Sequence, residues 1–209
     1  DMNEFTVHAN ASGVTHTLER STEQVKVGEA SACFSATSTR ESREGAWAKA
    51  GRGFSPHFDM KQCDALGVWV HGDGKGELLN IQLSNPDEYM RAYSEHYVTI
   101  DFEGWRYFEL LLRERDAARY RDYQWPYYNQ HGIYRTSLSR SHVSELNLYL
   151  NNLPPNDTAT VYLSPLKALR TTSIELRNPT LEVNGQKLTI PVTLPSGFYL
   201  EVEPAGDCA

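Results

Sequence analysis

Apolar and polar residues alternate with a period of two along several stretches of the chain. Successive side chains of a β-strand point to opposite faces, so this alternation predicts strands with one face in a core and one facing outward. The clearest predicted strands cover residues 65–72, 78–84, 96–102, 144–152 and 159–166. Further strands are expected in 23–38 (two strands broken at Gly28), 105–110 and 173–183.

Turn residues separate these stretches. The first two strands flank GDGKGE, residues 72–77, in which Asp73 and Gly74 predict the positive φ angles of a tight hairpin. Residues 109–122 have the composition of a short helix on a long loop, and no other segment has helical character. Many short strands with frequent turns predict an all-β fold, an antiparallel β-sandwich.

Length and turn signals also bear on domain organisation. A chain of 209 residues is long enough for one large β-domain with a small appendage. We expect a β-sandwich in 1–178. The remainder, 179–209, carries its own hairpin signal at Asn184-Gly185 and is either a C-terminal hairpin extension or the start of a neighbouring module.

The charge balance narrows the range of partners. A net charge of -7 argues against nucleic acid, because neutralising phosphates needs a clustered excess of Lys and Arg. No apolar run approaches the ~20 residues that cross a bilayer, so membrane insertion is not expected. The sequence opens at Asp1 without a charged leader or an apolar signal core, so we expect a targeting segment to have been removed or to be absent.

Alternation leaves an unusual set of residues on the outer side of the predicted strands. An exposed sheet surface ordinarily carries Lys, Glu, Thr and Arg, whereas this one combines rings and amides with a single carboxylate. The outer set consists of Trp69, His71, Asn80, Gln82, Tyr97, Thr99, Asp101, Asn147, Tyr149, Asn151 and Tyr162. A pyranose has an apolar C–H face that stacks on a ring and hydroxyls that need paired donors and acceptors, so this composition favours a saccharide surface open to water. The alternative, that half of these residues lie under loops or at the core edge, stays open.

A second aromatic concentration lies in RDYQWPYYNQHGIYR, residues 121–135. This stretch is expected to be a long connection at the rim of the sandwich, where binding loops are common. Its rings either line a sugar site or form the small core that a long loop needs. The predicted ligand-binding residues of both regions are Trp69, His71, Gln82, Asp101, Arg121, Tyr123, Trp125, Tyr127, Tyr128, Asn147 and Tyr149.

Familiar catalytic motifs are absent from the sequence. No H-E-x-x-H, G-x-S-x-G, Walker or dinucleotide-binding pattern occurs. The three cysteines, Cys33, Cys63 and Cys208, lack the close spacing of a zinc or redox site, and one disulfide or none is compatible with their odd number.

Two catalytic alternatives remain open. A glycoside hydrolase needs two facing carboxylates, for which Asp101 with Glu103 or Glu109 is available. A polysaccharide lyase needs a base, an acid and a positive charge near a uronate carboxylate. The residues close together in sequence that fit this second need are Tyr128, His131 and Arg135.

Three segments carry a resemblance to a known family. DALGVWVHGDGKGELLNIQL (64–83), HYVTIDFEGWRYFEL (96–110) and SELNLYLNNLPPNDTATVYLSPLKAL (144–169) resemble the galactose-binding-domain-like β-sandwiches. Among these the chain is similar to family 11 carbohydrate-binding modules and to the complex I intermediate-associated proteins. The resemblance covers roughly residues 20–178, and both the 121–135 stretch and the segment beyond 178 are additions to the minimal module.

The resemblance implies a jelly-roll sandwich that binds a polysaccharide or oligosaccharide without cleaving it. Such modules are appended to secreted polysaccharide-degrading enzymes, which implies a place in a larger multidomain protein at an extracellular, cell-surface or periplasmic location. Trp105 and Phe108 would then be core residues. One structural calcium ion is also implied, with Glu29 and Glu175 on the terminal strands as its expected ligands. A protein-interaction domain of the same fold is the third alternative.

Overall fold

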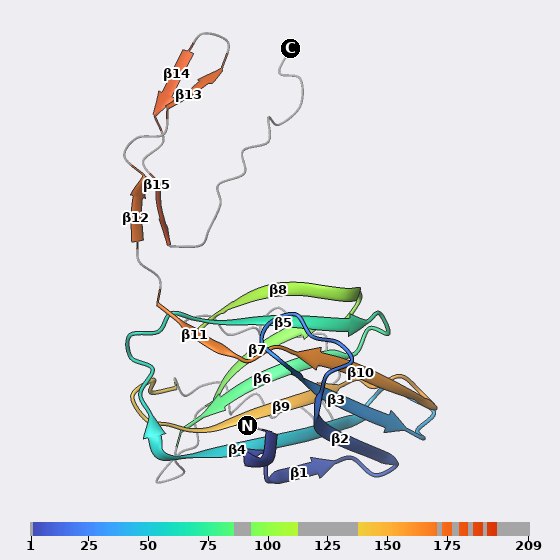
Figure 1. Cartoon of the computed structure of the whole chain (residues 1–209). Coiled ribbons are helices and arrows are strands. Elements are labelled where there is room, and N and C mark those ends of the chain that lie inside the picture. The colour runs from blue at the N-terminus through green and yellow to red at the C-terminus, as the bar shows by residue number, and fades with distance from the viewer. Residues whose placement is uncertain are drawn as a thin grey trace. The chain divides into compact units, whose positions relative to one another are not determined.

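The computed structural model describes residues 2–85, 93–112 and 138–170, together with the backbone of four short strands between 173 and 195. Two antiparallel sheets pack face to face (Figure 1). Sheet A has the strand order β1 (Val7–Asn10), β4 (Trp47–Phe58), β9 (Val143–Asn151), β6 (Leu78–Ser84) and β7 (Tyr93–Thr99). Sheet B has the order β11 (Lys167–Leu169), β5 (Ala65–Asp73), β10 (Asp157–Leu163), β3 (Ser31–Ser38) and β2 (Val14–Ser21). A further strand, β8 (Glu103–Leu111), also pairs with β5. A short 3-10 turn, η1 (Met2–Glu4), precedes β1.

The chain divides into two compact units, Asp1–Leu169 and Arg170–Ala209. The first contains the sandwich. In the second, β12 (Ser173–Leu176) pairs with β15 (Val192–Pro195), and β13 (Thr180–Val183) pairs with β14 (Gln186–Thr189), both antiparallel. The predicted domain boundary after residue 178 stays a prediction.

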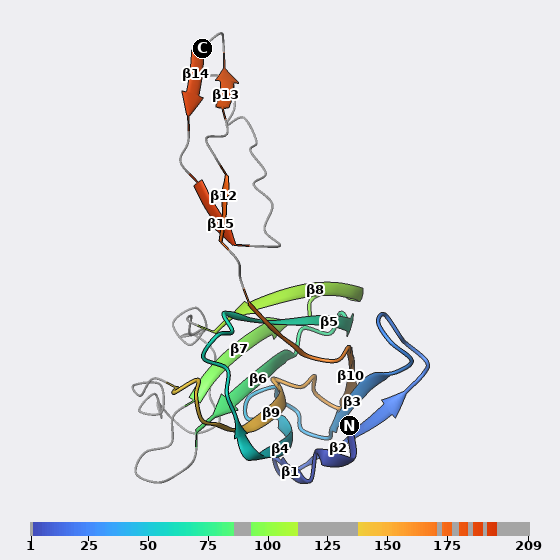
Figure 2. The same ribbon diagram turned by 60° about the vertical axis from the view of Figure 1, so that its left-hand side comes forward.

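The predicted all-β antiparallel sandwich is confirmed, and so is the phase of its strands. Figure 2 shows β8 and β5 as one layer and β7 and β6 as the other. Apolar side chains of both sheets form one buried core cluster. Phe34 of β3 is fully buried at the centre. The buried residues that alternation assigned to the core are Val68, Val70, Leu79, Ile81, Leu83, Val98, Ile100, Phe102, Leu148, Leu150, Val161 and Leu163.

No helix in the described part of the chain is long and apolar enough to span a membrane.

Several strand predictions need correction. Residues 23–27 form bends rather than a strand, and Glu109–Leu111 belong to β8 rather than to the start of a helix. The strands β1, β2 and β4 were not predicted. Their signal is weak because β1 and β2 are largely exposed edge strands, and because β4 turns the small residues Ala48 and Ala50 toward the core.

The predicted hairpin at Asp73-Gly74 is also wrong, because β5 lies in sheet B and β6 in sheet A. Residues 74–77 carry the chain from one sheet to the other. Gly74 and Gly76 have φ angles of 75° and 78°, so the positive φ expected at Gly74 is present, whereas the one expected at Asp73 is not. Such glycines mark a sharp turn without specifying whether the strands that follow pair with each other or separate.

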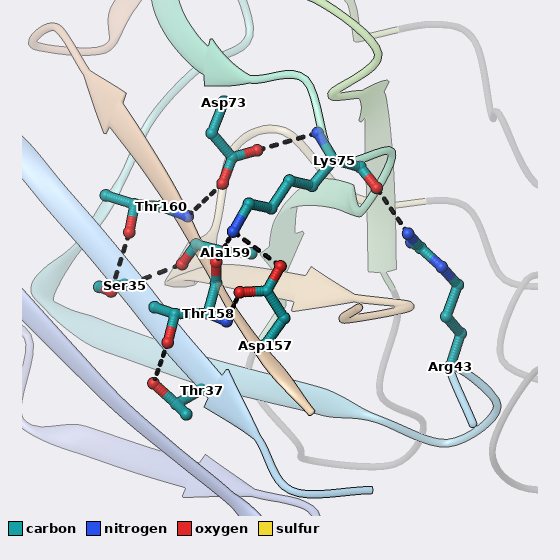
Figure 3. A network of polar contacts seen from close by, with 9 residues as sticks. All are labelled: Ser35, Thr37, Arg43, Asp73, Lys75, Asp157, Thr158, Ala159 and Thr160. Atoms are coloured by element: carbon teal, nitrogen blue, oxygen red, sulfur yellow. Dashed lines mark hydrogen bonds and ion pairs between the residues drawn. The ribbon is translucent and has the colours of Figure 1, made fainter. Parts of the chain in front are cut away.

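Polar contacts fix this crossover to sheet B (Figure 3). The Asp73 carboxylate accepts hydrogen bonds from the backbone N–H groups of Lys75, at 3.1 Å, and of Thr160, at 2.7 Å. Lys75 Nζ donates to the carbonyl of Thr158 at 2.6 Å and lies 2.8 Å from an Asp157 carboxylate oxygen. Arg43 donates to the Lys75 carbonyl at 2.6 Å. The Asp73 side chain therefore continues the link between β5 and β10 beyond the last backbone pair.

Glu77, the last residue of the crossover, is fully buried, and neither carboxylate oxygen has a hydrogen-bond partner in the described structure. Burial raises the pKa of Glu77 to about 8, and the nearby negative charge of Asp73 acts in the same direction. The Arg43 guanidinium opposes this shift without cancelling it. Glu77 is thus held protonated at neutral pH.

This burial generates a pH-dependent prediction. The folded pKa of Glu77 lies above the unfolded value, so its contribution to stability is present below about pH 4.5 and is lost as the pH rises through about 8. Between pH 5 and 8 the wild type should lose about 3 kcal/mol of unfolding free energy from this group alone. Glu77→Gln cannot ionise and should lose correspondingly less. Urea unfolding of both proteins across this range measures the difference, and parallel pH profiles would contradict the assignment.

Candidate functional site

The predicted saccharide surface is split between the two outer faces of the sandwich. The outer side of sheet A, here called the amide face, carries Trp47, Lys49, Asn80, Gln82, Glu95, Tyr97, Glu145, Asn147 and Tyr149. The outer side of sheet B, here called the aromatic face, carries Trp69, His71, Trp105, Tyr107 and Tyr162. The core separates the two sheets. Trp69 and His71 therefore cannot share a ligand site with Gln82, Asn147 and Tyr149.

Strand register arranges the amide face in rows. Residues directly opposite each other on antiparallel strands share a face. One row crosses four strands as Lys49, Tyr149, Asn80 and Tyr97, and the next crosses them as Gly51, Asn147, Gln82 and Glu95. Each row therefore begins at β4 and ends at β7, so aromatic and hydrogen-bonding side chains lie side by side.

A hydrogen-bond network joins the polar groups of the amide face. Gln82 Nε2 donates to Glu95 Oε1 at 2.6 Å, and Tyr97 Oη donates to Glu95 Oε2 at 2.5 Å. Asn147 Nδ2 donates to Gln82 Oε1 at 3.1 Å. The Glu145 carboxylate accepts from the hydroxyl of Ser84 at 2.9 Å. These bonds hold the amides and carboxylates in fixed orientations.

This network is more enclosed than the sequence predicted. Asn80, Gln82 and Asn147 retain only 3%, 5% and 2% of their accessible surface. The prediction that they face open water is therefore wrong, and their polar atoms are satisfied largely by one another. The exception is Asn80 Oδ1, a buried acceptor without a hydrogen-bond partner in the described structure.

The β4 side of the amide face is more open. Trp47 and Tyr149 are half-buried, with ring centroids 6.2 Å apart. Lys49 Nζ lies 5.6 Å from the centroid of the Tyr149 ring. Tyr149 is the cross-strand neighbour of Asn80. An accessible pair of rings thus adjoins an enclosed set of donors and acceptors.

Gly51 makes room for this arrangement. Gly51 is opposite Asn147 in the β4–β9 register, and a Cβ atom on it would overlap Asn147 Oδ1. The Asn147 side chain therefore occupies space that exists only because position 51 has no side chain.

The aromatic face has a different character. The rings of Trp69 and Tyr107 lie 5.3 Å apart, and His71 makes edge-on contacts with Trp105 at 5.3 Å and with Tyr162 at 5.7 Å. Tyr107 is 44% exposed and the other four are half-buried. The expectation that Trp105 is a core residue is wrong, because register places it opposite His71 on the outer side. Phe108, on the opposite side of β8, does pack against the core.

Residues 22–30 border the aromatic face. Tyr162 Oη donates to Glu23 Oε2 at 3.0 Å, and Lys26 Nζ lies 4.6 Å from the centroid of the Trp69 ring. Desolvation and the hydrogen bond to Glu23 raise the pKa of Tyr162 to about 12, and desolvation also raises the pKa of Tyr107. Both phenols therefore stay protonated over the physiological range, and the Tyr162 proton is engaged by Glu23.

The remaining predicted residues lie elsewhere. Asp101 is exposed in the connection between β7 and β8. Five of the predicted ligand-binding residues lie outside the described residues: Arg121, Tyr123, Trp125, Tyr127 and Tyr128. The lyase candidates Tyr128, His131 and Arg135 lie outside them as well. Of the hydrolase candidates, Glu103 and Glu109 belong to the outer side of β8, opposite Asp73 and Gly67.

Several residues of both faces were not predicted from the sequence. Trp47 and Lys49 were missed because β4 was not predicted. Glu95 lies before the predicted start of its strand at 96, and Tyr107 was not assigned to a face. Extending the alternation of 96–102 back by one residue places Glu95 beside Tyr97 on the outer side, so that signal was available.

The two expected calcium ligands belong to different compact units, Glu29 to the first and Glu175 to the second. Glu29 is 96% exposed, with one carboxylate oxygen 4.0 Å from Arg20. Glu175 lies in β12, of which only the backbone is described. Among the described residues, no group of three or more His, Cys, Asp or Glu side chains is placed to hold a metal ion. The calcium site stays a prediction. Cys33 and Cys63 are free thiols, and Cys208 lies outside the described residues.

A cavity of about 740 Å³ opens between the sheets, apart from both outer faces. Its walls are largely apolar and include Phe5, Phe54, Phe58 and Leu146. Its polar side chains are Arg20, Ser31, Arg52 and Ser164, and none of the amide side chains of the amide face lines it.

Comparison with known proteins identifies the fold. No protein-family model and no curated protein matches the chain. Solved structures do match. A family 11 carbohydrate-binding module from Clostridium thermocellum, in complex with a β-1,3-1,4-mixed-linked tetrasaccharide, is 11% identical with a TM-score of 0.51. That match covers 77% of this chain and 85% of the module.

Two further structures agree. The family 30 carbohydrate-binding module of a cellulosomal cellulase of Clostridium thermocellum is 14% identical with a TM-score of 0.52, and the match covers 77% of this chain and 90% of the module. A carbohydrate-binding module of the β-sandwich superfamily gives 10% identity and a TM-score of 0.52; the match covers 78% of this chain, which spans only 56% of that chain. At these identities the likeness establishes the fold, and it confirms the predicted resemblance to family 11 modules at that level.

The position of Gly51 allows a direct test of the amide network. Gly51→Ala should push the Asn147 amide out of its place and break its hydrogen bond to Gln82. Overpacking of this kind costs about 1–3 kcal/mol of unfolding free energy. Gly53→Ala is the matched control, because a Cβ there would meet only a backbone oxygen of Ser144 at 3.9 Å. Denaturant unfolding of both variants measures the difference, and equal stabilities would show that Asn147 does not need the space over Gly51.

Proposed function

We propose that this chain is a non-catalytic carbohydrate-binding module whose amide face holds the glycan. One observation carries the proposal: an accessible pair of rings, Trp47 and Tyr149, adjoins a fixed set of amide and carboxylate groups, because Tyr149 lies in the same row as Asn80 and beside the row of Asn147, Gln82 and Glu95. Ring faces and paired hydrogen-bonding groups side by side are the two features that a pyranose requires.

The division of roles follows from exposure. Tyr149 and Trp47, being half-buried, offer ring surface on which the C–H face of a sugar stacks. Asn80 lies beside Tyr149 in the same row and adds an amide to the enclosed polar set that adjoins the rings. Gln82, Asn147 and Glu95 are held by their mutual hydrogen bonds, which reduces the ordering cost of binding.

We include residues 121–135 in the proposed glycan site because they come shortly before β9 in the sequence. The segment precedes β9, the strand that carries Glu145, Asn147 and Tyr149 on the amide face. Its predicted contacts with the glycan remain part of the proposal: Arg121, Tyr123, Trp125, Tyr127 and Tyr128.

The fold comparisons support a carbohydrate partner. Solved structures that this chain resembles include family 11 and family 30 carbohydrate-binding modules, and one of these was solved with an oligosaccharide. Two belong to cellulosomal cellulases, which supports the further proposal that this chain is one module of a longer polysaccharide-degrading protein that acts outside the cell.

Hydrolysis is the second candidate function, because Glu95 and Glu145 both lie on the amide face. Both carboxylates are engaged: Glu95 accepts from Gln82 and Tyr97, and Glu145 accepts from Ser84. A general acid or nucleophile has to be free to meet the glycosidic bond. These engagements favour binding over cleavage, and an assay for new reducing ends and for unsaturated uronates during incubation with polysaccharides separates the two functions.

Tyr149 provides the mutational test. Retention of the protein in gels containing soluble polysaccharides identifies a bound glycan, and calorimetry then gives its affinity. Tyr149→Ala should weaken amide-face binding about tenfold, equivalent to about 1.4 kcal/mol, because a stacking ring is lost. Tyr149→Phe keeps the ring and should bind within about threefold of wild type.

Thermal unfolding of both variants separates binding from folding. Wild-type affinity in a folded Tyr149→Ala protein would show that the amide face does not hold the glycan. Failure of the wild type to bind any glycan in the panel would overturn the proposed function itself.

A further inference from the structure

We infer that the aromatic face is a second glycan-binding surface, separate from the amide face and suited to a neutral polysaccharide chain. The inference rests on the proposed function, since it concerns the same class of ligand. Five ring-bearing side chains from three strands carry it: Trp69, His71, Trp105, Tyr107 and Tyr162.

The rings form a two-row platform. Trp105, His71 and Tyr162 lie in one row across β8, β5 and β10, and Tyr107 and Trp69 lie in the next. Adjacent strands are about 4.8 Å apart and alternate residues of a strand about 7 Å apart, so the platform measures roughly 10 Å by 7 Å. This area is large enough for a sugar ring to stack on one member while its neighbour in the glycan reaches the next.

Contacts within the platform hold the rings in place. His71 stands edge-on to both Trp105 and Tyr162, at interplanar angles of 78° and 86°. Gly67 leaves space for Tyr107, because a Cβ at position 67 would lie 2.5 Å from Tyr107 Oη. The backbone N–H and C=O groups of Trp69 bond to Ser164 at 3.0 Å and 2.9 Å. A platform fixed before binding loses little side-chain entropy when a ligand arrives.

Hydroxyl groups continue the surface beyond the rings. On the same side of sheet B, β10 and β3 carry Thr158, Thr160, Ser35 and Thr37. The hydroxyls of Ser35 and Thr160 lie 3.0 Å apart, and those of Thr37 and Thr158 lie 2.7 Å apart (Figure 3). A hydroxyl both donates and accepts, so this strip offers partners to a chain of sugar hydroxyls that extends past the platform.

Charge around the platform selects a neutral ligand. The outer side of sheet B and the bordering segment carry the carboxylates Glu19, Glu23, Glu103 and Glu109. Two lysines lie at this surface in the described residues, Lys26 over the Trp69 ring and Lys167 opposite Gly67 on β11, so the four carboxylates outnumber them. Uronate-rich or sulfated polysaccharides would be repelled by this excess of negative charge. The occupant that fits both rings and charge is an uncharged glycan.

Because the two faces lie on opposite sides of the core, a protein with both sites would hold two glycan chains, or two parts of one chain, at once. The second site adds effective concentration without adding contacts at the first. The measurable consequence is a stoichiometry of two oligosaccharides per protein.

Variants on each face test the inference. The probes are a neutral oligosaccharide, beginning with the β-1,3-1,4-mixed-linked tetrasaccharide, and a uronate polymer. Calorimetry with the neutral probe should give two equivalents of wild-type affinity for wild type, and only one such equivalent for Trp105→Ala, for Tyr107→Ala and for Tyr149→Ala, with the altered site binding more weakly. Tyr107→Phe is the matched control and should keep two, because it retains the ring. The aromatic-face site should not take up the uronate polymer.

The Tyr107 variants show whether a loss of binding comes from the site or from misfolding. Tyr107 is 44% exposed on an edge strand, so its truncation should leave the unfolding transition close to that of wild type. If Trp105→Ala and Tyr107→Ala keep the wild-type stoichiometry while Tyr149→Ala abolishes binding, this inference is overturned and the proposed function stands. If the aromatic-face variants lose all binding and Tyr149→Ala loses none, the aromatic face is the glycan site and the amide-face assignment fails. A wild type that binds no neutral glycan overturns both.

Discussion

Burial of one side of every strand is the constraint on which the rest of this structure depends. Each sheet of the sandwich turns one face to a shared core, so alternate residues of each strand are apolar and the intervening ones point away from it. Side chains on the outer faces are thereby spaced by the pleat and by strand register rather than by loops. Rings and amides drawn from residues far apart in sequence come to lie in rows, which is how Lys49, Tyr149, Asn80 and Tyr97 become neighbours. A rigid lattice of this kind is a suitable base for recognising a ligand that is itself a repeating chain.

The sequence predicted the buried half of this arrangement well. Alternation of large apolar residues identified β5, β6, β9 and β10 and the direction in which their side chains point. It failed for β2 and β4, whose core-facing positions are either few or occupied by alanine, because a small or exposed side chain leaves no periodic hydrophobic signal. The turn at Asp73-Gly74 shows a second limit. Local backbone chemistry specified the bend, whereas the destination of the chain depends on which sheet has room for the next strand.

The candidate site shows the same difference between local strand signals, which the sequence contains, and strand pairing, which it does not. Alternation assigned Trp69 and Gln82 to the outside, and it contained no information that their strands belong to different sheets. The burial of the amide side chains could not be predicted from alternation either, because exposure depends on what covers a sheet face rather than on the strand itself. Trp105 illustrates the converse. A tryptophan on an edge strand was expected to be in the core, and instead the register with His71 turns it outward. Pairing between strands, which a single sequence does not display, therefore decides which predicted residues act together.

One feature of the topology bears on how the domain is made. Strand β10 lies between β5 and β3, and its partner residues on β3 are about 120 positions earlier, as in the hydroxyl contact of Ser35 with Thr160. A growing polypeptide emerges from the ribosome at roughly 5–20 residues per second, so β3 waits many seconds for the strand that separates it from β5. During that interval both strands expose unpaired edges, which are templates for association with other chains. Sheet B thus closes late in synthesis, and the long-range pairing that builds the aromatic face is also the step at which the nascent chain is most exposed to aggregation.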